Sequence, residues 1–142
     1  MRTSLSHPLK IAQLQSEPGQ GRIGITFCPG KHQPDAMTGG WHRDLDIDLD
    51  AIRDWGAAAV ITLVEDHELH ALKVANLGQK VRDRHLDWYH LPIADVAIPS
   101  AAFESEWQEV GERLRARLRD GFNLLVHCKG GLGRAGRSPL AY

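Results

Sequence analysis

The chain has 142 residues, 42% of them hydrophobic and 25% charged, a composition that fits one globular domain with a buried core. Its net charge of −1 gives no indication of a nucleic-acid or membrane partner. The first ten residues lack the apolar stretch of a secretory signal, and no apolar run reaches the length of a membrane span.

The amino-terminal part predicts two strands and a loop. Two short apolar runs in residues 9–27, LKIAQL and RIGITF, are separated by SEPGQG, which indicates two strands around a turn. Residues 28–41 are rich in glycine, proline and polar side chains, so we expect a long loop there, of the kind that often carries function.

A helix follows in DLDIDLDAIRDWG. Its four alternating aspartates are similar to a calcium loop, but Leu49 and Trp55 stand where that loop needs glycine and a bidentate glutamate. We therefore expect Asp48 to cap a short helix that buries Leu49, Ile52 and Trp55 and ends at Gly56.

The rest of the chain alternates strands and helices. Residues 57–64 form a near-continuous apolar run, typical of a buried parallel strand, and EDHELHALKV then predicts a short helix. Residues 87–93 indicate another strand. A longer helix opens at Ser100 and closes at Gly121, and FNLLVH is a strand that leads into Cys128. One face of that helix carries Phe103, Trp107, Val110, Leu114 and Leu118. This order predicts an α/β domain with a central, mostly parallel sheet flanked by helices.

The segment HCKGGLGRAG allows two interpretations. Gly131, Gly133 and Gly136 spell the dinucleotide fingerprint G-x-G-x-x-G, but that motif needs a βαβ unit and an acid about 20 residues further on. Neither follows here, and this interpretation leaves Cys128 and Arg134 without a role. We consider it the weaker of the two.

The alternative is a phosphate loop with a thiol nucleophile. A tight turn directly after a strand directs successive backbone N–H groups at a phosphate dianion, and Arg134 adds a bidentate grip. The same field favours a thiolate at Cys128, placed for in-line attack on phosphorus. The expected phosphate-binding residues are Lys129, Gly130, Gly131, Leu132, Gly133 and Arg134.

Such a mechanism also needs a proton donor for the leaving oxygen. Asp95 follows a predicted strand and precedes the Ser100 helix, so it lies on a loop suited to reach over the site. Two interpretations of Asp95 stay open on position alone: a general acid, or a turn residue.

HCKGGLGR resembles the H-C-x5-R signature of cysteine-dependent protein phosphatases. Together with YHLPIAD and the helix between the two motifs, it resembles the dual-specificity branch, and most of all the cyclin-dependent-kinase-associated phosphatase group. The similarity spans residues 87–134 and is fainter over residues 22–64. The resemblance implies a phosphoprotein phosphatase that needs no metal and no cofactor. It implies Cys128 as nucleophile, Arg134 as phosphate clamp, Asp95 as general acid, and His127 as the residue that orients the loop and tunes the thiol.

Two features depart from that family. Many members place serine or threonine after the arginine, where this chain has Ala135, so hydrolysis of the intermediate is in question. The family also continues with a long buried helix, whereas this chain ends at Tyr142. We expect the carboxyl-terminal helices to be missing or frame-shifted after about residue 136. A one-base shift of a possible coding sequence for RSPLAY reads Thr-Ile-Ala-Ala-Arg-Leu, which is compatible with a helix.

Other candidate residues have simpler interpretations. His67 and His70 lack the spacing of a zinc protease, Cys28 is expected to be a small packed residue, and Lys31 a solvated one. Trp41 lies in the long loop and is a candidate to border the site. Two cysteines are too few for a disulfide framework, so we expect reduced thiols in the cytoplasm.

The sequence thus predicts a single domain over residues 1–142 that hydrolyses phosphotyrosine, phosphoserine or phosphothreonine in a protein partner. Three alternatives stay open: a phosphate-binding module with weak or no turnover, a phosphatase for a small phosphorylated molecule, and a rhodanese-like sulfurtransferase. The sulfurtransferase ranks low because it gives Asp95 and the spacing to Arg134 no role.

Overall fold

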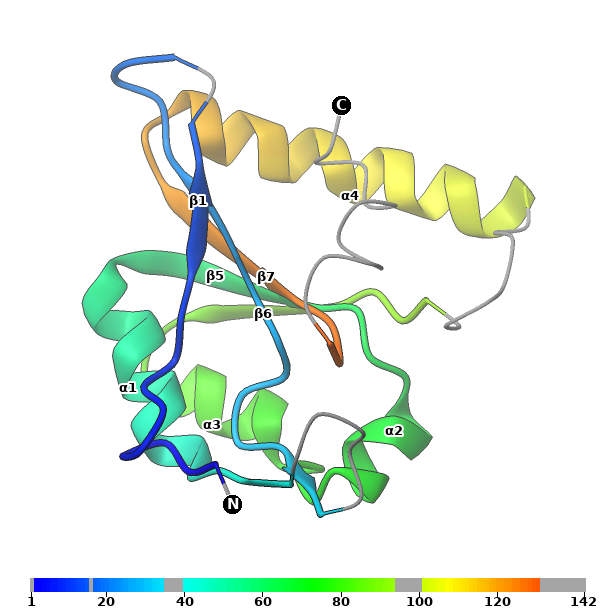
Figure 1. Ribbon diagram of the computed structural model, residues 1–142. Coiled ribbons are helices and arrows are strands. Elements are labelled where there is room, and N and C mark those ends of the chain that lie inside the picture. Colours follow the sequence, from blue (N-terminus) through cyan, green and yellow to red (C-terminus); the bar gives the residue numbers. More distant parts are fainter. Residues whose placement is uncertain (1, 16, 35–39, 94–100, 131–142) are drawn as a thin grey trace.

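The structure is a computed structural model that describes residues 2–15, 17–34, 40–93 and 101–130. In this part of the chain four short strands come first; from residue 45 on, helices and strands alternate, except that two helices follow one another between residues 66 and 83 (Figure 1). The strands are β1 Ala12–Leu14, β2 Ile23–Thr26, β3 His32–Gln33, β4 Trp41–His42, β5 Ala57–Thr62, β6 Asp87–His90 and β7 Asn123–His127. The helices are α1 Leu45–Trp55, α2 Asp66–Ala71, α3 Leu77–Asp83 and α4 Ala101–Arg119.

The main sheet has five strands in the order β1-β2-β7-β5-β6. β1 pairs antiparallel with β2, and the other pairs are parallel. The predicted α/β class with a mostly parallel sheet is therefore confirmed. β7 lies between β2 and β5, because its apolar sequence NLLVH buries both faces.

Helices cover the sheet on both faces (Figure 1). On one face α4 buries Trp107, Leu114 and Leu118 against β5 and β7, which confirms the predicted apolar stripe for its described side chains. α1 and α3 cover the other face, where Val60 and Leu125 belong to the core. None of the helices in the described ranges is long and apolar enough to cross a membrane.

The helix around Asp48 differs from its prediction at the amino end. Asp44 is the cap, since its side chain accepts a hydrogen bond from the Ile47 N–H at 2.9 Å. Asp48 instead lies inside α1 and is 1% exposed, so the prediction of Asp48 as a cap was wrong. The end at Gly56 is confirmed, with φ at 101°.

Two further elements were not foreseen. α3 follows α2 after a short turn in which Lys73 has a positive φ of 61°. The segment 28–41, predicted as one long loop, contains β3, which pairs with β4. Residues 35–39 of that segment lie outside the described residues.

Candidate active site

The described start of the predicted phosphate loop, His127 to Gly130, lies at the carboxyl end of the central strand. In register across the sheet, His127 pairs with Thr26 of β2 and Thr62 of β5, and Thr62 pairs with His90 of β6. The carboxyl edge of a parallel sheet is where ligands of α/β proteins bind. The fold thus places Cys128 directly beyond this edge, between two neighbouring strands.

Cys128 is a buried thiol, 2% exposed, on the α4 face of the sheet. Cys28 is also a buried thiol, but it belongs to the core on the opposite face. Burial raises the pKa of Cys28 to about 12, so this thiol stays protonated. The prediction that Cys28 is a small packed residue is confirmed.

His127 is held by a chain of hydrogen bonds inside the sheet. Its Nδ1 lies 3.4 Å from the carbonyl oxygen of Cys128, and its Nε2 lies 2.7 Å from Oγ1 of Thr62. A carbonyl only accepts, so Nδ1 carries the hydrogen and Nε2 of the neutral ring accepts from the Thr62 hydroxyl. That hydroxyl in turn accepts from Nε1 of Trp88 at 2.7 Å.

The surroundings of His127 keep it neutral. The side chain is fully buried, and burial lowers its pKa from 6.5 to about 4. A ring that stays uncharged near pH 7 is suited to fix the backbone of Cys128 and poorly suited to carry protons during a reaction. Its contact with the Cys128 carbonyl is consistent with the expected role in orienting the loop.

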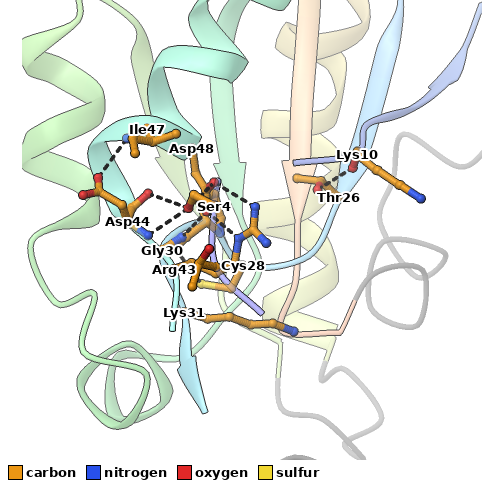
Figure 2. A network of polar contacts seen from close by, with 12 residues as sticks. Ser4, Lys10, Thr26, Cys28, Gly30, Lys31, Arg43, Asp44, Ile47 and Asp48 are labelled. Carbon is orange, nitrogen blue, oxygen red and sulfur yellow. Dashed lines mark hydrogen bonds and ion pairs between the residues drawn. The ribbon is translucent and has the colours of Figure 1, made fainter. Parts of the chain in front are cut away.

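Lys31 comes close to the loop from the chain that follows β2 (Figure 2). Its ammonium donates a hydrogen bond to the Lys129 carbonyl oxygen at 3.3 Å. It also lies 4.7 Å from the ring centroid of Phe27 and 4.5 Å from that of Trp41. Lys31 is only 5% exposed, so the prediction of a solvated lysine was wrong. Burial lowers the pKa of its ammonium below the usual value.

The loop that carries Lys31 is attached to α1 through Asp48 (Figure 2). The Asp48 carboxylate accepts from Nε and Nη2 of Arg43 at 2.8 and 3.0 Å, and from the Gly30 N–H at 2.8 Å. It also accepts from the Ser4 hydroxyl at 2.9 Å. A buried carboxylate is tolerated when several hydrogen bonds satisfy it, and the Asp48 carboxylate accepts four. The network therefore fixes Gly30, the residue before Lys31.

Sequence reasoning missed both Lys31 and Asp48, although one signal pointed to Lys31. Parallel strands end at the same edge of a sheet, so CPGK after β2 and CKGG after β7 are brought together. The Cys28 N–H donates to the Lys129 carbonyl at 3.4 Å, which shows this juxtaposition directly. Asp48 gave no such signal, because its partner Arg43 lies outside the helix and the contact depends on tertiary packing.

Trp41, the candidate to border the site, packs against Phe27 with ring centroids 5.0 Å apart. Its contact with Lys31 links Trp41 to the described start of the loop. Asp95, Gly131, Leu132, Gly133, Arg134 and Ala135 lie outside the described residues.

Among the residues that the structure describes, one group of side chains has donor atoms close enough for a metal ion: those of Glu65, His67 and Glu68, all within 4.8 Å of one another. They lie at the start of α2, where the Glu68 carboxylate accepts from the Glu65 N–H at 3.2 Å. Capping of α2 explains why these side chains lie together.

Solved structures define the class of this fold. The chain is similar to kinase associated phosphatase, in a crystal structure with the catalytic-site cysteine replaced by serine. The TM-score is 0.76 with 25% identity, over 90% of this chain and 68% of that one. Tk-PTP in its active form gives a TM-score of 0.59 with 28% identity, over 83% and 64% of the two chains. The protein has the fold of the dual-specificity and tyrosine phosphatases.

The family follows from the sequence match. The family model of cyclin-dependent kinase inhibitor 3 (CDKN3) matches residues 19–141, and the chain belongs to this protein phosphatase family. The resemblance to the kinase-associated phosphatases is thereby confirmed. Cyclin-dependent kinase inhibitor 3 of Mus musculus is 28% identical and that of Homo sapiens 27%, each over 113 residues and 80% of this chain. The chain spans about half the length of the curated relatives it matches.

Proposed function

We propose that this protein hydrolyses phosphate monoesters of a phosphorylated protein through a phosphocysteine intermediate on Cys128. The observation that carries the proposal is the place of this thiol, directly after the central strand β7 and between β2 and β5. A related crystal structure describes a catalytic-site cysteine in kinase associated phosphatase, which supports the same role here.

The reaction has two steps. The Cys128 thiolate attacks phosphorus, an S–P bond forms, and the P–O bond to the substrate breaks while the leaving oxygen takes a proton from Asp95. Water then attacks phosphorus and returns a proton to Asp95. The S–P bond breaks, inorganic phosphate leaves, and the thiolate is restored. No oxidant or cofactor is needed for this balance.

The chain before Asp95 supports its assignment as the acid. The Ile93 N–H donates to the Leu63 carbonyl at 3.0 Å, and the Leu63 N–H donates to the His127 carbonyl at 3.1 Å. Leu63 therefore links the chain two residues before Asp95 to the residue before Cys128. Two extended residues span at most about 7 Å, a reach suited to bring Asp95 over the site.

The phosphate is held by the loop itself in this proposal. Backbone N–H groups of residues 129–133 surround the dianion, and Arg134 adds a charged pair of hydrogen bonds. The family supports a phosphorylated protein as partner, since its members are named for cyclin-dependent kinases. The buried thiols Cys28 and Cys128 fit a reducing compartment, and we place the protein in the cytoplasm.

Substitution Cys128→Ser tests the proposal. An alcohol at this position stays protonated and is a poor nucleophile, so turnover of an aryl phosphate should be lost. Binding of inorganic phosphate and cooperative thermal unfolding should persist, which controls for loss of the fold. Turnover that survives in Cys128→Ser would refute the phosphocysteine mechanism.

A further inference from the structure

The Lys129 carbonyl, near the start of the phosphate loop, accepts hydrogen bonds from two donors that lie on the same side of it. The Lys129 oxygen accepts from the Cys28 N–H at 3.4 Å and from the Lys31 ammonium at 3.3 Å. Both donors belong to the chain that follows β2. The Lys129 carbonyl therefore points toward the chain that follows β2.

The direction of this carbonyl fixes the direction of the next amide. In a trans peptide unit the C=O and the N–H point in opposite directions, and the described chain contains no cis peptide. The Gly130 N–H must therefore point away from Lys31. Anions in such loops are bound by inward-facing N–H groups, so the orientation of this peptide decides whether its amide contributes.

We propose that Lys31 is a positioning residue for phosphate transfer: by holding the Lys129 carbonyl toward β2, it turns the Gly130 N–H toward the anion bound over Cys128. This inference rests on the proposed function. In this role Lys31 acts through the backbone of the loop.

The residues around Lys31 hold its side chain in a defined position. The ammonium lies over the rings of Phe27 and Trp41, and both ring faces attract it. The preceding Gly30 is tied to Asp48, and its φ of 70° makes the turn that brings Lys31 to the loop. Burying an ammonium costs free energy, and an apolar side chain packed in the same space would avoid that cost. A role for its N–H donors explains why a lysine stands there.

The test compares Lys31→Met, Lys31→Arg and the exposed control Lys10→Met. Methionine keeps a stem of similar length against Phe27 and Trp41 but donates no hydrogen bond, whereas arginine keeps both charge and donors. Each variant is titrated with inorganic phosphate, and the ¹H–¹⁵N resonance of Gly130 is followed. Steady-state rates with an aryl phosphate and thermal unfolding complete the set.

We expect Lys31→Met to bind phosphate roughly tenfold to a hundredfold more weakly, the loss typical of a hydrogen bond from a charged donor. Its kcat should fall more than its KM rises, because the oriented amide matters most when charge develops on the phosphoryl oxygens. The phosphate-dependent shift of the Gly130 resonance should vanish in Lys31→Met. It should return in Lys31→Arg and stay unchanged in Lys10→Met.

A Lys31→Met variant that unfolds cooperatively, binds phosphate like the wild type and keeps the Gly130 shift would overturn the inference. If Lys31→Met does not fold, Lys31→Gln is measured as a second variant: its amide keeps an N–H donor without the charge, so the phosphate-dependent shift of Gly130 should persist. Loss of that shift in Lys31→Gln, with the shift kept in Lys31→Arg, would overturn the donor role. Absence of turnover in the wild-type chain refutes the proposed function instead. Normal wild-type turnover with an unchanged Lys31→Met refutes the positioning role alone.

Discussion

Protonation of His127 should destabilise the fold in a defined pH range. The unfolded chain takes up this proton near pH 6.5, whereas burial delays it in the folded state to about pH 4. Because the folded pKa is lowered, the stabilising contribution is fully present above pH 6.5 and is lost as the pH falls toward 4. At about 1.4 kcal/mol for each tenfold change in proton affinity, the total loss is about 3 kcal/mol.

The measurement is urea unfolding, followed by tryptophan fluorescence, at several pH values between 7.5 and 4. His127→Gln serves as the reference, because its amide oxygen can accept from Thr62 but does not titrate. Carboxylates that titrate below pH 5 affect both proteins and cancel in the difference. The free energy of unfolding of the wild type relative to His127→Gln should fall with decreasing pH.

His67→Gln is the matched control, since the His67 side chain is 75% exposed. Its free energy of unfolding should run parallel to that of the wild type over the whole range. The reasoning is refuted if the difference between wild type and His127→Gln is the same at pH 7.5 and pH 4.

Two further predictions concern Asp95 and the loop that carries Lys31. Asp95→Asn should slow turnover of an alkyl or tyrosyl phosphate much more than that of an aryl phosphate with an acidic leaving group, as measured by kcat/KM; equal losses would exclude Asp95 as the acid. Gly30→Ala should destabilise the protein by about 2–4 kcal/mol, because the new Cβ would lie 2.6 Å from Cβ of Leu45. Gly19→Ala controls for backbone strain alone, since Gly19 also has a positive φ but an open surrounding; equal losses in urea unfolding would show that the contact with Leu45 is harmless.

Sequence patterns predicted the helices and strands in which the apolar residues of the element itself determine which face is buried. The apolar run before Cys128 became β7, the run of residues 57–64 became β5, and Trp107, Leu114 and Leu118 line the buried face of α4. In each case the pattern of apolar residues predicts which side chains are buried.

The errors arose where a polar side chain is buried by a distant partner. Asp48 has the sequence context of a helix cap, but Arg43 and Gly30 draw its carboxylate into the interior. Lys31 follows a turn, where lysines are usually solvated, yet Phe27 and Trp41 cover it. Local propensity gives no information about such contacts, which exist only once the sheet has formed.

The loop residues were predicted from one motif, and the structure places only its first part. His127 and Cys128 lie at the carboxyl edge of the sheet, as the motif requires. The ring of His127 is held by a hydrogen-bond chain through Thr62 and Trp88, from two other strands, and no spacing in the sequence indicates that contact.

The central position of β7 also bears on the order in which the protein is made. β2 and β5 are synthesised long before β7, and the sheet order leaves them without the strand that joins them until Leu124 and Leu125 emerge. A nascent chain lacking β7 therefore exposes two unpaired parallel edges, a state prone to aggregation. Pairings this distant in sequence form slowly. The strand that joins β2 to β5 is also the strand that ends at Cys128, so this thiol reaches the carboxyl edge of the sheet in the same event that joins the two halves of the sheet.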